Sequence, residues 1–114
     1  MHELATLVNL MNIAEKAARE NGAAKIRRLT LDVGAMTGIE PRYLQYYFPQ
    51  ASAGTMMEGA ELVVNEIPVV ITCRDCGIDY TPSKENDRRC PVCGSAAGAI
   101  VSGRELAVAS IEAG

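Results

Sequence analysis

The sequence is poor in the residues on which many functional sites depend. It has a single histidine, His2, no tryptophan, one phenylalanine and no GxxxxGKS/T phosphate-binding loop in 114 residues. A single imidazole excludes most active sites that depend on histidine. The basic residues are scattered apart from the doublets at 27–28 and 88–89, and the net charge is −3. This balance excludes a broad nucleic-acid-binding surface.

Long apolar runs are absent as well. Glu3 stands where a secretory signal would carry basic residues, and Asn9, Asn12 and Glu15 interrupt the apolar residues that follow. No stretch is long enough to span a membrane. We therefore expect a cytoplasmic protein, in which thiols stay reduced or bind metal rather than pairing as disulfides.

The residues that are present have the composition and patterning of one globular unit, 48% hydrophobic and 22% charged. Apolar residues recur at helical spacing over 4–20, and Asn21-Gly22 ends this predicted helix. Over 26–33 apolar and polar residues alternate, which predicts a strand with one buried face that ends at Gly34. The first third of the chain is thus expected to be a helix followed by a strand.

The rest of the main fold is predicted from prolines and β-branched residues. Pro41 suits the first position of a second helix, in which Pro49 should produce a kink or an early end. The Val- and Ile-rich stretch 60–73 predicts one or two strands, with Pro68 at a bend or an edge, and 103–113 predicts a last strand. We therefore expect an α/β (α+β) fold with a small three-stranded sheet and two helices.

All four cysteines lie between these last strands, as two CxxC pairs separated by thirteen residues: Cys73, Cys76, Cys90 and Cys93. Gly77 and Gly94 follow the two pairs, where a tight turn needs a residue that tolerates a positive φ. Each short turn can present two thiolates to a common point, and four thiolates complete the tetrahedral shell that zinc prefers. An iron site, two disulfides or a thioredoxin-type redox pair are the alternatives. The spacing favours one structural zinc per chain, and a shell of four thiolates leaves no open position for catalysis.

The cysteine segment is also too poor in apolar residues to build a core of its own. Structural zinc contributes on the order of 10 to 16 kcal/mol to small modules of this kind. We therefore expect residues 73–94 to form a zinc-ribbon-like module inserted between two strands of a main domain that comprises 1–72 and 95–114.

The amino terminus combines three nitrogen donors. The α-amine of Met1, the deprotonated amide of His2 and its imidazole Nδ1 can close adjacent chelate rings, with the Glu3 amide as a possible fourth donor. Planar nitrogen ligation suits nickel(II) or copper(II) better than zinc. The bulk of His2 should leave the initiator methionine in place, and the helix from Leu4 should hold the terminus against the fold. The alternative is an ordinary solvated terminal histidine.

Several segments together resemble the HypA/HybF family of hydrogenase maturation factors, which are nickel metallochaperones. The resemblance rests on MHEL at the start, VGAMTGIEPRYLQYYF in the middle, the two CxxC pairs and the ending SGRELAVASIE. It covers nearly the whole chain.

The resemblance implies a role for each of these motifs. Nickel, the transient cargo, would bind at Met1, His2 and Glu3, while the four cysteines would hold structural zinc. Glu40, an acidic residue at a helix start, is a further candidate near His2, or it only favours that helix electrostatically. The implied function is nickel delivery for the nickel–iron active site of a hydrogenase, without enzymatic activity. The implied partners are the hydrogenase large subunit and an accessory GTPase. A zinc-ribbon adaptor that ignores nickel is the alternative.

Overall fold

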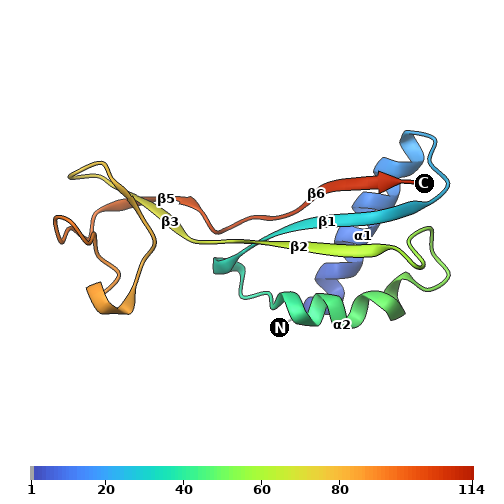
Figure 1. Ribbon diagram of the computed structural model, residues 1–114, viewed down its shortest axis with the longest axis horizontal. Coiled ribbons are helices and arrows are strands. Elements are labelled where there is room, and N and C mark those ends of the chain that lie inside the picture. The colour runs from blue at the N-terminus through green and yellow to red at the C-terminus, as the bar shows by residue number, and fades with distance from the viewer. Residues whose placement is uncertain (1) are drawn as a thin grey trace.

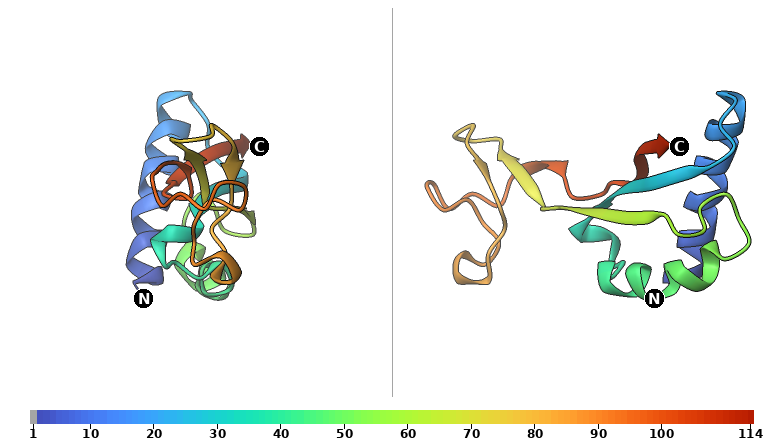
Figure 2. Two further views of the ribbon diagram at one scale, coloured as in Figure 1. Left: turned by 90° about the vertical axis from the view of Figure 1, so that its left-hand side faces the viewer. Right: turned by 45° about the vertical axis from the view of Figure 1, so that its right-hand side comes forward.

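Two lobes, each with its own three-stranded sheet, lie at opposite ends of an elongated molecule (Figure 1). The structure is a computed structural model that describes residues 2–114, and its principal extents are 53 × 27 × 17 Å. We call residues 2–67 and 106–114 the helical lobe and residues 70–102 the cysteine lobe. The right-hand view in Figure 2 shows the same separation, with the α-helices at one end.

The first helix, α1 (Glu3–Glu20), turns one apolar face toward the sheet, as the spacing predicted. Leu7, Ala14 and Ala18 on that face are buried. The helix ends as expected, because Gly22 adopts a positive φ of 75° and the Asn21 side chain donates to the Ala17 carbonyl at 2.8 Å.

The next three elements form a β–α–β unit. Strand β1 (Ile26–Gly34) pairs in parallel with β2 (Glu61–Ile67), and a parallel pair needs a crossover, which α2 (Pro41–Ser52) supplies. Pro41 occupies the start of α2, as predicted. The helix continues past Pro49 to Ser52, so this proline does not end it.

The last strand, β6 (Leu106–Ala113), pairs antiparallel with β1 and completes the order β2-β1-β6. A register shift between Thr30 and Leu31 breaks the alternation of β6, so that Val108 and Ile111 both pack against the core. Both helices contribute to that core, together with β1 and β2; its fully buried large side chains are Leu7, Ile26, Leu29, Leu31, Leu44 and Met57. The predicted fold of a small sheet with two helices is confirmed.

The cysteine lobe contains β3 (Val70–Cys73), β4 (Asp79–Tyr80) and β5 (Gly98–Ser102), in the order β4-β3-β5. Strands β4 and β5 were not predicted from the sequence, because both are short and only Tyr80 among their residues is buried. Two short 3-10 helices, η1 (Ala35–Thr37) and η2 (Lys84–Asn86), lie in the connections. The boundaries of the inserted module, 73 and 94, stay a prediction. No described helix is long and apolar enough to cross a membrane.

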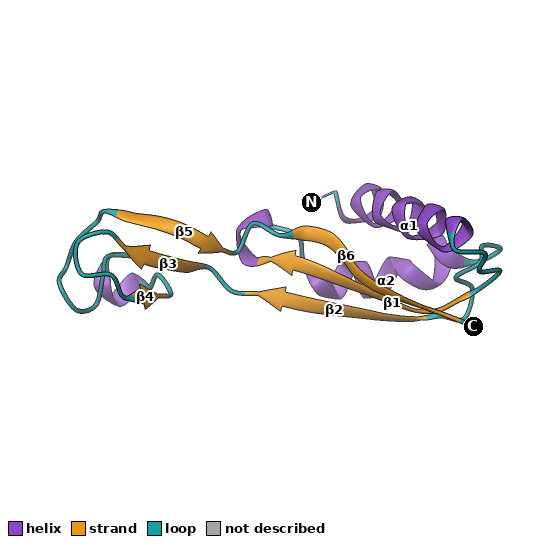
Figure 3. Ribbon diagram, turned by 90° about the horizontal axis from the view of Figure 1, so that it is seen from above, coloured by secondary structure: helices purple, strands orange, loops and turns teal. Residues whose placement is uncertain are grey.

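Two adjacent chain segments join the lobes, because β2 leads through Pro68 into β3 and β5 leads through Gly103 into β6 (Figure 3). The Ser102 hydroxyl donates to the Pro68 carbonyl at 2.8 Å, and the Met36 amide donates to the Gly103 carbonyl at 2.8 Å. A Cβ on Gly34 would lie 2.1 Å from the Gly103 oxygen, so glycine is required for this close approach. The junction is therefore closely packed and hydrogen-bonded.

Candidate metal centres

The first candidate centre lies where the two helices begin side by side. His2 is the N-cap residue of α1, its side chain is exposed, and its carbonyl accepts the first helical hydrogen bond, from the Thr6 amide at 2.9 Å. In Figure 1 the start of α1 lies beside the start of α2. The helix thus begins with His2 at the surface of the helical lobe.

Glu3 links the two helix starts. Its side chain is only 6% exposed, and its Oε2 accepts a hydrogen bond from the Glu40 amide at 3.1 Å. Glu40 is the N-cap residue of α2, where unpaired amides and the helix dipole favour a negative charge. A buried carboxylate is costly without such a donor. Glu3 therefore stabilises the packing of α1 against α2 at the candidate centre.

The structure brings three of the four predicted nickel residues together. His2 and Glu3 are neighbours in the chain, and the backbone of Glu40 contacts the Glu3 carboxylate, while the Glu40 side chain is exposed. Met1, the fourth, lies outside the described residues. Glu40 was predicted near His2, but the burial of Glu3 and its bond to the Glu40 amide could not be predicted, because a contact between two helices leaves no local pattern in the sequence.

The second candidate centre is formed by the four cysteines. Their sulfur atoms all lie within 4.8 Å of one another, and the Cys73–Cys93 and Cys76–Cys90 pairs are each 3.5 Å apart. A disulfide needs about 2.05 Å between its sulfurs, so all four thiols are free. Tetrahedral zinc with Zn–S bonds of about 2.3 Å separates its sulfurs by about 3.8 Å. The donor set and its spacing are therefore suited to zinc.

Two equivalent turns orient these sulfurs. The Gly77 amide donates to the Cys73 carbonyl and the Gly94 amide to the Cys90 carbonyl, both at 2.9 Å. Both glycines have a positive φ, of 80° and 75°, which residues with a Cβ rarely adopt. This confirms the expectation that each CxxC pair closes with a glycine turn.

The pKa values of the clustered thiols indicate that a cation would stabilise them. The amide of Cys76 lowers the pKa of the Cys73 thiol to about 6. The Ser95 amide favours the Cys93 thiolate, but the neighbouring Cys73 sulfur and burial outweigh it and raise the pKa of Cys93 to about 12. Ionising one sulfur thus opposes ionising the next. Burial and the four thiolates also raise the pKa of Tyr80, which covers the cluster. A divalent cation among the sulfurs removes this conflict.

The sequence matches, over residues 1–113, a family described as "Hydrogenase/urease nickel incorporation, metallochaperone, hypA". The chain belongs to the HypA family. Hydrogenase maturation factor HypA of Chloroflexus aurantiacus is 40% identical over 112 residues, which cover 98% of each chain. The protein of the same name in Aquifex aeolicus is 34% identical, with 98% of this chain and 96% of that protein covered.

Solved HypA structures share the fold. The solution structure of the nickel metallochaperone HypA from Helicobacter pylori has a TM-score of 0.68 at 24% identity and covers 99% of this chain and 97% of its own. A second HypA solution structure has a TM-score of 0.71 at the same identity. The chain is thus a member of a family of nickel-incorporation metallochaperones and maturation factors, which are not enzymes, and the predicted family is confirmed.

Proposed function

We propose that this HypA-family chain binds nickel(II) at its amino terminus and delivers it for assembly of the nickel–iron active site of a hydrogenase. The ligands are the amine of Met1, the amide and imidazole of His2, and Glu3, with Glu40 as a further acidic residue at the site. One observation carries the proposal: His2 and Glu3 begin a helix whose first turn is bonded to the N-cap of α2. The donors of His2 and Glu3 therefore start from a backbone that is already ordered, which lowers the entropy lost on binding.

A single inserted residue tests the amine ligand. A glycine added ahead of Met1 keeps every side chain but converts the amine of Met1 into a peptide amide. We expect the extended protein to bind nickel more weakly and to lose the absorption spectrum of planar nickel(II), while its fold and zinc content stay the same. A glycine added after Gly114 is the matched control.

Two substitutions test the other donors. His2→Ala should weaken nickel binding at least as much as the glycine extension, and Glu40→Ala should weaken it less. Because nickel displaces protons from its donors, the affinity should also fall as the pH drops. Unchanged nickel affinity and spectrum in the extended protein would contradict the amine ligand.

We further propose that the cysteine centre holds one structural zinc through Cys73, Cys76, Cys90 and Cys93. The fit of four convergent thiolates supports this assignment. When bound, zinc cross-links the two CxxC turns, so its role in the chain is folding. Metal analysis of the purified protein should give one zinc per chain, and a stoichiometry unchanged by Cys76→Ser and Cys93→Ser together would contradict the assignment.

The family description, hydrogenase or urease nickel incorporation, and relatives named as hydrogenase maturation factors support two direct partners that we propose. The hydrogenase large subunit would receive the nickel, and an accessory GTPase would take part in the transfer. Both exchanges would take place in the cytoplasm. Crosslinking of the nickel-loaded protein to each purified partner is the direct test, with the glycine-extended protein as the control that lacks the proposed site.

A further inference from the structure

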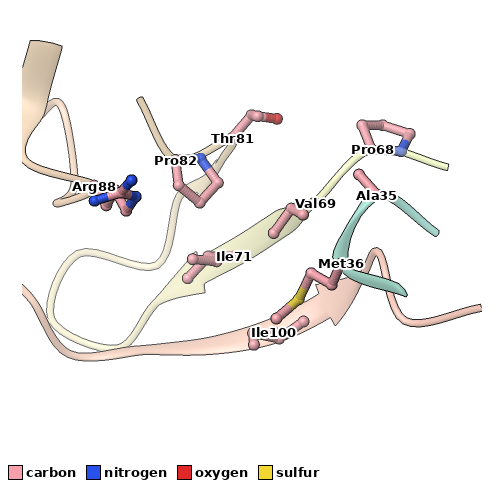
Figure 4. A pocket seen from close by; sticks show the side chains of 9 residues that line it. All are labelled: Ala35, Met36, Pro68, Val69, Ile71, Thr81, Pro82, Arg88 and Ile100. Atoms are coloured by element: carbon pink, nitrogen blue, oxygen red, sulfur yellow. The ribbon is translucent and has the colours of Figure 1, made fainter. Parts of the chain in front are cut away.

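An apolar groove with a volume of about 540 Å³ runs across the junction of the two lobes (Figure 4). Ile71 and Ile100 are cross-strand partners in β3 and β5, so their side chains share one face of the sheet and form the floor. Met36, from η1, lines the groove from the side of the helical lobe, and Pro82 lines it from the cysteine lobe. The groove is therefore formed by residues of both lobes.

The groove leaves large apolar side chains open to solvent. Met36, from the helical lobe, is 47% exposed, and Ile100, from the cysteine lobe, is 37% exposed, although both line the same groove. Apolar surface gathered in a concave site is typical of binding sites, and methionine adapts its shape to different partners. The shape and composition of the groove therefore favour an apolar side chain as its occupant.

A single cation sets the charge of the groove. Arg88 is the one charged residue among the described residues that line it, and it lies at one end, with Ala35 and Pro68 at the other (Figure 4). Within residues 2–114, no carboxylate lies at salt-bridge distance from Arg88. Its backbone is held by a hydrogen bond from its amide to the Ser83 carbonyl at 2.8 Å. A guanidinium presented in this way pairs best with a carboxylate.

We propose that this groove docks a segment of a partner protein that carries an aliphatic or aromatic side chain beside a carboxylate. The apolar side chain packs against Met36 and Ile100, and the carboxylate pairs with Arg88. This inference rests on the proposed function for the identity of the partner, which would be a protein of hydrogenase maturation. The chemistry of the segment follows from the groove alone.

The groove also connects docking with the metal. Ile71 packs against the cysteine cluster and also lines the groove. In the sequence, Arg88 lies between the two CxxC pairs. A cysteine lobe that is unfolded cannot form this floor and this charged end. The cysteine lobe is thereby more than a folded appendage, because it supplies most of a partner-binding surface.

Two matched pairs of variants test the proposal. Arg88→Glu reverses the charge in the groove, and Arg89→Glu makes the same change at the next residue, which does not line it. Ile100→Asp places a charge on the floor, and Val101→Asp places the same charge on the adjacent residue of β5, which is 60% exposed and does not line the groove. Zinc content and amide exchange establish that each variant is folded.

The probes are synthetic peptides selected from a random library on the zinc-loaded protein, with counter-selection against Arg88→Glu. We expect the selected peptides to share an acidic residue next to a large apolar residue. Arg88→Glu and Ile100→Asp should each weaken binding by about tenfold or more, and the two control variants by less than about threefold. The purified large subunit and GTPase are then measured against the same four variants.

Three results would overturn the proposal: selected peptides without acidic residues, equal binding by a groove variant and its control, or a dimer of this chain that Arg88→Glu abolishes. If Ile100→Asp fails to fold, the Arg88 and Arg89 pair decides the question. Nickel titration of the same variants is independent of the groove. Loss of nickel binding only in the glycine-extended protein, together with intact peptide binding, would separate a failure of one proposal from a failure of the other.

Discussion

The helical lobe and the cysteine lobe each contain a three-stranded sheet, but they differ in what lies inside them. In the helical lobe, apolar side chains from both helices and from β1, β2 and β6 pack into one core. In the cysteine lobe, the buried residues are Cys73, Cys90 and Tyr80, with Ile71 and Ile78 partly buried beside them. The helical lobe is therefore stabilised by apolar burial, whereas the cysteine lobe has few buried apolar side chains and instead brings four thiols together.

Removing the metal should have the largest effect and should act on one lobe only. Stripping zinc, or replacing the buried Cys90 by Ser, removes on the order of 10 kcal/mol or more from the cysteine lobe. We expect the amides of Gly77 and Gly94, bonded within the CxxC turns, to lose hydrogen-exchange protection, while amides of β1 keep theirs. Lowering the pH should have the same effect, because protons compete with zinc for thiolates.

The control for this first experiment is Val92→Ala, since Val92 lies between Cys90 and Cys93 and is 71% exposed. Equal loss of hydrogen-exchange protection in both lobes after zinc removal would show that the two lobes fold as one unit. It would contradict a separate source of stability for each lobe.

Truncating a core side chain should instead destabilise the helical lobe and leave the cysteine lobe unchanged. Leu29 is fully buried at the centre of the sheet in β1, and Leu29→Ala should destabilise the helical lobe by about 2–5 kcal/mol. Urea unfolding followed by the circular dichroism of the helices would measure this loss. Zinc content should not change. Leu106→Ala, on an exposed residue at the start of β6, is the control and should cost much less.

A smaller effect is expected at the contact between the helix starts. Glu3→Ala removes the acceptor of the Glu40 amide and should cost about 1–3 kcal/mol, because a hydrogen bond to a buried charged group is lost. Glu3→Gln keeps an acceptor and should recover part of that loss. Glu20→Ala, at the exposed end of α1, should be nearly neutral. Equal stability of Glu3→Ala and the parent protein would show that the bond does not stabilise the helical lobe.

The smallest effect is expected from the surface ion pairs across the sheet. Arg28 bonds Glu61 on β2 and Glu112 on β6, each at 2.8 Å, and these pairs raise the pKa of the guanidinium. Because the side chains are about half exposed, Arg28→Gln should cost roughly 0–1 kcal/mol. Adding salt should reduce the difference between the two proteins in thermal unfolding. A difference that grows with salt would contradict this account.

The sequence predicted best where the signal is local. The spacing of apolar residues along α1 and β1, Pro41 at the start of α2 and the glycines after each CxxC pair are patterns within a few residues, and each was confirmed. The CxxC spacing also predicted a cluster that the structure brings within 4.8 Å.

The features that were missed depend on tertiary contacts. Strand β5 carries an exposed Val101 and has no strong alternation, so only its pairing with β3 makes it a strand. Neither the burial of Glu3 nor the groove at Met36 and Ile100 leaves a local pattern, because each requires elements that lie far apart in the sequence. The nickel and zinc ligands remain predictions that the experiments above test.

The position of the cysteine lobe between β2 and β6 has a consequence for the order of folding. Arg28 and its partner Glu112 are 84 residues apart, so β1 cannot acquire its second neighbour until almost the whole chain is available. The entropy of closing a loop grows with its length, and long-range pairing slows folding. Metal bound by the cysteines would draw Cys73 and Cys93 together and so shorten the flexible chain that separates β2 from β6. The sheet of the helical lobe should therefore refold faster when zinc is present from the start than when zinc is added at the end.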